Sequence, residues 1–270
     1  MMKLDDIRCP ICQGDVSRVG GSLTCGSKHT FDIAKSGYVN LNVKGATAGD
    51  SKEMVRARSD FLDGGYYSRF AEKLVEVLGE MPHKTVIDAG CGEGYYSVKA
   101  AKEAGCALYG FDLSKAAVEK AAKRAAAADA DASFFVGGIF DLPVKNENID
   151  VVLNLFAPCA SEEFLRVLKP HGRLIMGIAG ENHLLGLKSA LYSEVYLNNP
   201  EKLADIDGFT RIKTDRVSYK VVIEGRKQIE NLFSMTPYYW KTSREDADKL
   251  RELERLETEL DFEIAVFEKN

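Results

Sequence analysis

Four side chains that bind metals well lie close together near the start of the chain. A Cys-x-x-Cys pair is followed, after twelve residues, by a Cys-x-x-x-His pair; the four residues are Cys9, Cys12, Cys25 and His29. Three thiolates and an imidazole make a closed tetrahedral zinc site, and so short a segment has too little core to fold without such a staple. A closed site has no coordination position for water, so the sequence predicts a structural Zn²⁺ ion.

A glycine-rich segment, VIDAGCGEG at residues 86–94, joins an apolar run to a helical pattern. Its glycines, Gly90, Gly92 and Gly94, allow a sharp turn and the close approach of a ligand. A dinucleotide would place its pyrophosphate at the start of the helix, where the upstream carboxylate of Asp88 would repel it. S-adenosylmethionine instead offers a sulfonium cation and an amino group, so Asp88 favours this methyl donor.

A second acidic residue, Asp112, ends the next apolar run. Its separation from the glycines is about that at which an acidic side chain binds ribose hydroxyls. Asp112 could instead cap the following helix, but Ser114 is better placed to do so. The sequence therefore predicts that Asp112 also binds the cofactor.

From Thr85 onward, short β-branched or aromatic runs alternate with helical patterns, which predicts a parallel sheet covered on both faces. The expected strands are 85–90, 106–112, 132–137, 149–156 and 172–180. Ser114 is expected to cap one helix, and Ser161 to begin another that Pro170 ends. The alternating runs at 217–224 and 261–269 predict an antiparallel end to the sheet. The fold class is therefore α/β, Rossmann-like, with a small N-terminal zinc ribbon.

Length and composition fit one small and one large module. Of 270 residues, 45% are hydrophobic and 29% charged, which is typical of a globular protein and excludes a collagenous or disordered class. The start of the chain lacks the pattern of a secretion signal, and no apolar run approaches the length of a bilayer span, so a cytoplasmic protein without a membrane partner is expected. We predict a zinc module over 1–43, a linker over 44–65 and a catalytic domain over 66–270.

The glycine-rich segment and Asp112 resemble two motifs of the class I methyltransferases, over about residues 84–180. Five further segments, together with the Cys-x-x-Cys pair, resemble the RlmA family of 23S rRNA (guanine-N1)-methyltransferases. These segments are HTFDIAKSGYVNL (29–41), FLDGGYY (61–67), NLFAPC (154–159), ENHLLGLK (181–188) and MTPYYW (235–240). The resemblance implies a guanine in a domain II hairpin of 23S rRNA as acceptor. It also implies that Tyr67, Tyr96, Ser97 and His183 line the cofactor pocket.

Methylation at guanine N1 requires removal of a proton, a hydrogen-bond donor near O6 and an in-line approach of the methyl group. Asn154, at the end of the fourth strand, is a candidate to bind the base edge. Trp240, with Tyr238 or Tyr239, is a candidate to stack on an extruded guanine, although core packing is the commoner role of such aromatics.

The Pro158-Cys159 pair also resembles the nucleophile motif of RNA cytosine-5 methyltransferases. No cysteine follows Cys159 in the sequence, whereas those enzymes use a second one, so a buried thiol is the favoured interpretation.

Two other functions stay open on the sequence alone. The protein could methylate a small molecule, with the zinc module as a lid, or it could bind RNA without catalysis. The basic residues of the N-terminal segment, Arg8, Arg18, Lys28 and Lys35, suit contact with an RNA hairpin, although the whole chain carries a net charge of −5. The sequence leaves open whether the protein forms a homodimer.

Overall fold

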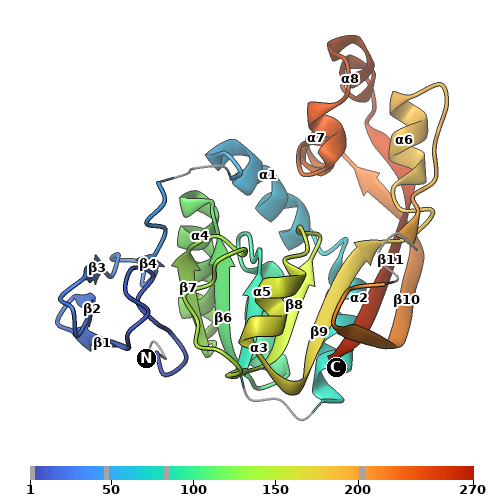
Figure 1. The fold of residues 1–270 in the computed structure, drawn as a ribbon. Helices are drawn as coiled ribbons and strands as arrows, with labels where there is room; N and C mark the ends of the chain where they lie inside the picture. The colour runs from blue at the N-terminus through green and yellow to red at the C-terminus, as the bar shows by residue number, and fades with distance from the viewer. Residues whose placement is uncertain (1–3, 46–48, 82–84, 201–204) are drawn as a thin grey trace.

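An eight-stranded, mostly parallel sheet forms the centre of the computed structural model, which describes residues 4–45, 49–81, 85–200 and 205–270 (Figure 1). The strand order is β10-β11-β9-β8-β5-β6-β7-β4. The five expected parallel strands are all present; they are β5 (Thr85–Ala89), β6 (Ala107–Asp112), β7 (Ala132–Val136), β8 (Ile149–Leu155) and β9 (Leu168–Ala179). Because the chain leaves β5 for β6 and β7 and returns to β8 on the other side, the point of reversal lies between β5 and β8.

The antiparallel end of the sheet is also confirmed. Strand β11 (Arg255–Lys269) pairs antiparallel with β9 on one side and with β10 (Phe209–Glu224) on the other. Both strands begin earlier than the sequence predicts. The first half of β10 carries mostly polar residues, so its sequence lacks the apolar alternation of a half-buried strand.

Helices cover both faces of the sheet; those around the parallel strands are α2 (Ser68–Gly79), α3 (Tyr95–Glu103), α4 (Lys115–Ala128) and α5 (Ser161–Val167). Ser114 caps α4 as predicted, since its hydroxyl accepts a hydrogen bond from the Ala117 N–H. The prediction for α5 is also confirmed, since the helix begins at Ser161 and ends at Val167, before Pro170. Ala160 is its N-cap, and the chain is extended from Leu168, where β9 begins.

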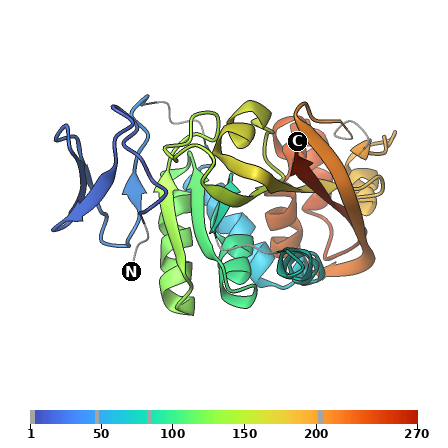
Figure 2. The ribbon, with the colours of Figure 1, turned by 60° about the horizontal axis from the view of Figure 1, so that its bottom comes forward.

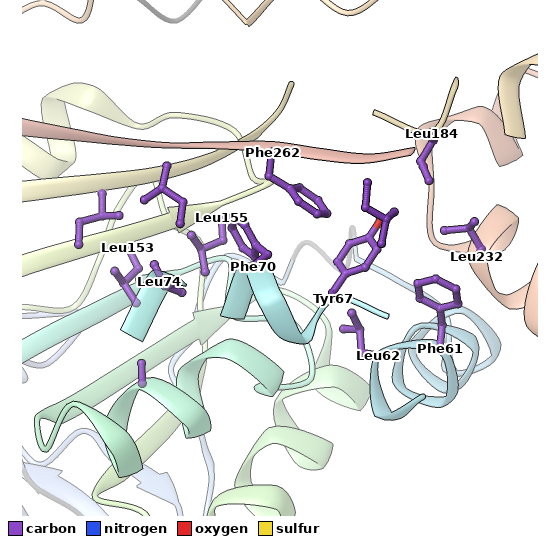
Figure 3. Packing of buried hydrophobic residues seen from close by; sticks show 14 of the residues in the cluster. Phe61, Leu62, Tyr67, Phe70, Leu74, Leu153, Leu155, Leu184, Leu232 and Phe262 are labelled. Atoms are coloured by element: carbon purple, nitrogen blue, oxygen red, sulfur yellow. The ribbon is translucent and has the colours of Figure 1, made fainter. Parts of the chain in front are cut away.

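Much of the predicted linker 44–65 is helical. Residues 46–48 lie outside the described ranges, but α1 (Lys52–Asp63) follows them, and Ser51 caps it by accepting from the Met54 N–H. The helix buries Phe61 and Leu62 in the core, beside Leu232 of α7 (Arg226–Ser234) (Figure 3). The sequence did not indicate this helix because most of its residues are polar and its buried residues do not follow a single helical stripe.

The N-terminal module contains a small antiparallel sheet of β1 (Val16–Val19), β2 (Ser22–Cys25) and β3 (Thr30–Asp32), which Figures 1 and 2 show beside the main sheet. Strand β4 (Val39–Asn40) then joins the main sheet by pairing in parallel with β7. The buried Leu23 and Phe31 belong to the same hydrophobic cluster as Phe135 of β7. The zinc module is therefore packed against the catalytic domain.

A third group of elements gathers beyond the carboxyl end of the sheet (Figure 1). It consists of α6 (Leu185–Leu191), α7, the short 3-10 helix η2 (Pro237–Trp240) and α8 (Arg244–Leu250). None of the helices in the described ranges combines the length and apolar composition that crossing a bilayer requires.

Candidate zinc and cofactor sites

The structure brings the four expected zinc ligands together. The candidate ligand atoms of Cys9, Cys12, Cys25 and His29 all lie within 4.8 Å of one another. The His29 Nδ1 atom is 3.5 Å from the Sγ atoms of both Cys9 and Cys25. A zinc ion with sulfur and nitrogen ligands at about 2.0–2.3 Å fits ligand atoms at such separations. The donor set and its geometry therefore fit a tetrahedral Zn²⁺ site.

The local backbone supports metal binding at this cluster. The chain after Cys9 closes into a tight turn, in which the Gln13 N–H donates to the Cys9 carbonyl. A hydrogen bond from the Gly14 N–H, together with Ser27 and His29, lowers the pKa of the Cys12 thiol to about 6. Zinc binds the thiolate form, so the free energy needed to deprotonate Cys12 on metal binding is small.

The glycine-rich segment forms the turn between β5 and α3. All three glycines have positive φ angles, 93° for Gly90, 53° for Gly92 and 80° for Gly94. A Cβ atom on Gly90 would lie 2.7 Å from the Ala157 side chain, and one on Gly94 would lie 2.8 Å from Ala121. Side chains at these positions would therefore both strain the backbone and collide with the walls of the site.

Asp88, at the carboxyl end of β5, is almost completely buried beside this turn. Its Oδ2 atom accepts a hydrogen bond of 2.5 Å from the Ser97 hydroxyl, whereas its Oδ1 atom has no partner among the described residues. Burial raises the pKa of Asp88 to about 7, although the Ser97 hydrogen bond lowers it. A buried carboxylate with an unpaired oxygen is costly until a cation or a donor satisfies it, and the amino group or sulfonium of S-adenosylmethionine would do so.

Asp112, at the end of β6, holds the turn from the other side. Its Oδ2 atom accepts from the Gly92 N–H at 3.0 Å and its Oδ1 atom from the Ser114 N–H at 2.8 Å. A carboxylate can accept about four hydrogen bonds, so capacity for two ribose hydroxyls is left. Asp112 thus both fixes the glycine-rich turn and fits the role expected of it.

Glu93 belongs to the same site, and the sequence reasoning missed it. This carboxylate is 1% exposed, its Oε2 atom accepts from the Tyr95 N–H at 3.0 Å, and Arg124 lies 3.7 Å away. Its Oε1 atom is buried without a hydrogen-bond partner among the described residues, and burial raises its pKa. The sequence does contain a feature that could have identified Glu93, since it is a charged residue within a glycine-rich turn.

Tyr67 and His183 are 116 residues apart in the chain, and the structure places them in contact. The Tyr67 Oη atom is 3.3 Å from His183 Nε2, and His183 Nδ1 accepts from the Asp261 backbone N–H at 3.2 Å. Burial lowers the pKa of His183 to about 3, so the ring is neutral and carries its proton on Nε2. His183 then donates to Tyr67, which keeps its own hydroxyl proton for another acceptor.

An aromatic cluster links this pair to Tyr96. The Tyr67 ring packs against Phe262 at 4.9 Å, and Tyr96 packs against Phe70 at 5.4 Å between ring centroids. Phe70 and Phe262 are themselves 4.8 Å apart, and Figure 3 shows them beside Tyr67. The residues expected to line the cofactor pocket therefore lie around one region at the carboxyl ends of β5, β6 and β8.

The two candidates for contact with the acceptor base lie in very different places. Asn154, near the end of β8, is 1% exposed, and its amide donates to the Ala89 and Pro158 carbonyls at 3.3 and 3.0 Å. Trp240 is 72% exposed on η2, with its ring 5.2 Å from that of Tyr239. Asn154 thus ties the segment after β8 to the end of β5, and Trp240 is not a core residue.

Cys159 has the environment of a structural thiol. Burial raises its pKa, which disfavours the thiolate that a nucleophile requires. Cys91 and Cys106 are buried. Cys159 itself is only partly buried, packed against the edge of a hydrophobic cluster, so the expectation of a fully buried thiol is corrected in degree.

Two family models match the chain. One, described as the RlmA N-terminal zinc ribbon, matches residues 7–42, and the other, described as a methyltransferase domain, matches residues 80–235. The solved structure of the YcgJ protein from Bacillus subtilis has the same fold as the larger domain, with a TM-score of 0.51 and 15% identity over 74% of this chain and 97% of that one.

Two curated relatives carry a more specific description. The 23S rRNA (guanine(748)-N(1))-methyltransferase of Streptomyces fradiae is 35% identical over 68% of this chain and 67% of its own. The protein YxjB of Bacillus subtilis strain 168, assigned as a 23S rRNA (guanine-N(1)-)-methyltransferase, is 29% identical over 96% of this chain and 95% of its own. With its Cys3His cluster and its glycine-rich cofactor turn, the chain belongs to the RlmA family of S-adenosylmethionine-dependent rRNA (guanine-N1)-methyltransferases.

Proposed function

We propose that this protein transfers the methyl group of S-adenosylmethionine to N1 of one guanine in a domain II hairpin of 23S rRNA. The observation that carries the proposal is the match to YxjB along 96% of the chain, which spans both the zinc cluster and the cofactor turn. A small-molecule methyltransferase would use the zinc module only as a lid, whereas YxjB, which matches along both modules, is assigned to 23S rRNA. A non-catalytic RNA-binding protein would have no need of the buried Asp88 carboxylate, which destabilises the fold unless it serves a ligand.

The chemistry assigns distinct roles to the residues of the site. S-adenosylmethionine supplies an electrophilic methyl group when it is bound. Asp88 and Asp112 hold it from the ends of β5 and β6, and Tyr67, Tyr96, Ser97 and His183 line the rest of its pocket. The acceptor base lies beside the end of β8, where Asn154 shapes the segment, and Trp240 on η2 offers an exposed ring to the RNA.

Primer extension tests the reaction directly. The purified protein is incubated with labelled S-adenosylmethionine and a domain II fragment of 23S rRNA, and N1-methylguanine is mapped by arrest of the reverse transcriptase. We expect one arrest at a hairpin guanine and none with heat-inactivated protein. Methyl transfer to free nucleosides but to no RNA, with assembled ribosomal particles included, would contradict the proposal in favour of a small-molecule acceptor.

We further infer that the RNA backbone crosses a groove between the two modules. The groove has a volume of about 520 Å³; its lining is basic and comes from the segment after β3 and from α4, namely Ala34, Lys35, Ser36, Tyr38, Lys115, Glu119 and Lys123. Lys35 and Lys115 are exposed there. Arg8, Arg18 and Lys28 of the zinc module are further candidates for contact with RNA phosphates.

Replacing Lys35 and Lys115 by alanine should weaken hairpin binding and leave cofactor binding unchanged. Removing one lysine–phosphate interaction lowers the slope of log affinity against log salt by about one, so the slope should fall by up to about two in the double variant. Filter binding between 50 and 200 mM salt measures this slope. Lys99→Ala is a matched control, because Lys99 is paired with Glu103 on α3, outside the groove. An unchanged slope in the double variant would remove the groove from the RNA path.

Two narrower expectations belong to the same proposal. A protein that modifies ribosomal RNA is expected in the cytoplasm, where that RNA is assembled. The homodimer that the sequence leaves open stays a prediction, and equilibrium sedimentation of the purified chain with and without the hairpin tests it.

A further inference from the structure

Phe156, directly after β8, has an unusual backbone and an unusual exposure. Its φ angle is 56°, in the left-handed region that large side chains rarely adopt, and its side chain is 46% exposed. Strained residues persist where their surroundings hold them, and they concentrate at functional sites. Here the Phe156 N–H donates to the Gly177 carbonyl at 2.9 Å, which fixes the strained turn to β9.

The segment that carries Phe156 is built against the cofactor turn. The Ala157 Cβ atom lies 2.7 Å from where a Cβ atom on Gly90 would be, and the Asn154 amide donates to the carbonyls of Ala89 and Pro158. The position of Phe156 relative to the glycine-rich turn is therefore fixed by packing and by two hydrogen bonds. It also lies at the reversal point between β5 and β8, where ligands bind in sheets of this kind.

One side of the Phe156 ring is held and the other is open. Its centroid lies 5.2 Å from that of Phe70, 5.8 Å from Phe262 and 6.2 Å from Tyr96. Phe70 and Phe262 are fully buried, whereas nearly half of Phe156 is exposed. Because the ring is already immobilised, little side-chain entropy is lost when a base stacks on its open face.

We propose that Phe156 is the stacking surface for the target guanine, holding the flat base so that its N1 faces the methyl group. The inference rests on the proposed function, since it needs an extruded base as substrate. Trp240 is less suited to this role: its ring stands on a short 3-10 helix, 72% exposed, and its only ring contact in the described part of the chain is with Tyr239. Trp240 then contacts RNA outside the reacting nucleotide.

Three variants test the proposal on the mapped hairpin. Phe156→Leu keeps an apolar side chain and removes the ring; it should lower kcat/KM for the RNA by about tenfold to a hundredfold, the usual contribution of one base stack. Phe156→Tyr should stay within about threefold of the unmodified protein because it retains the ring. Tyr196→Leu removes another exposed aromatic ring, 78% exposed on the loop after α6, and should change nothing.

Cofactor affinity, measured by calorimetry, is the second measurement. It should be the same in all three variants, and far-ultraviolet circular dichroism should show the same fold. The proposal is overturned if Phe156→Leu stays within threefold of the unmodified protein, if Phe156→Tyr loses as much as Phe156→Leu, or if the loss in Phe156→Leu is matched by an equal loss of cofactor affinity. Failure of the unmodified protein to methylate RNA would instead reject the proposed function and would be seen before any variant is made.

Discussion

Asp88→Asn should lose at least about thirtyfold in affinity for S-adenosylmethionine, and methyl transfer should fall with it. Removing one partner of a buried charged pair costs about 2–5 kcal/mol, and 2 kcal/mol corresponds to about thirtyfold. The buried Oδ1 atom, which has no partner among the described residues, is the acceptor that the substitution alters. Isothermal titration of the purified variant with S-adenosylmethionine measures the loss without any RNA present.

The pH dependence of the same affinity gives a sharper test. A bound cation favours the ionised carboxylate, and burial places the pKa of Asp88 at about 7. About one carboxylate in ten is then ionised at pH 6, so affinity should rise about eightfold between pH 6 and pH 7.5 and then level off. Asp112 and Glu93 also raise the pKa of Asp88, whereas Ser97 lowers it. The dependence of cofactor affinity on pH should be absent in Asp88→Asn.

The unfolding temperature of the ligand-free variant shows whether a loss of cofactor affinity in Asp88→Asn is due to misfolding. The pKa of Asp88 is raised on folding, so its ionisation opposes the fold as pH rises from about 4 through 7. The ligand-free Asp88→Asn protein should therefore unfold at the same temperature as the unmodified one or at a higher one when both are measured at pH 8. A variant that binds the cofactor normally at pH 7.5, or that keeps the pH dependence, would show that Asp88 is not the group that meets the cation.

Local patterns predicted the parts of this molecule that depend on neighbours in sequence. Asp88 and its three glycines lie within seven residues, and the four zinc ligands within 21. The sequence predicted strands β5 to β9 because parallel strands that are buried on both faces are continuous apolar runs. By contrast, α1 and the first half of β10 expose polar residues along most of their length, so composition concealed them.

Contacts between distant residues could not be derived in the same way. Tyr67 and His183 were expected at the site only through the family resemblance, and nothing local showed that one ring nitrogen would accept from the Asp261 backbone while the other faced Tyr67. Asn154 was placed correctly at the end of its strand, but its amide turned inward to two carbonyls. The strain at Phe156 depends on backbone geometry that sequence alone does not display.

The zinc site should separate RNA methylation from cofactor binding. His29→Ala removes one of four clustered ligands, and structural zinc contributes about 10–16 kcal/mol to small modules of this kind, so the N-terminal sheet should unfold. One face of the parallel sheet packs in a hydrophobic cluster, with Leu74 and Phe262 among its members, that contains no residue of the N-terminal module, so S-adenosylmethionine should still bind within about threefold. Methylation of the hairpin should fall more than a hundredfold, because the basic surface loses its scaffold.

Metal content, cofactor affinity and methylation are then measured on the same preparations. Cys159→Ser is the matched control, since it removes a thiol outside the cluster and should leave the zinc content at one per chain. β4 joins the N-terminal module to the main sheet through β7, so a small fall in the unfolding temperature of the catalytic domain is expected as well. If the zinc-free protein methylates the hairpin at the normal rate, the module is not part of RNA recognition. If it loses the cofactor too, the two modules form a single cooperative unit, joined by the pairing of β4 with β7 and by the hydrophobic cluster that they share.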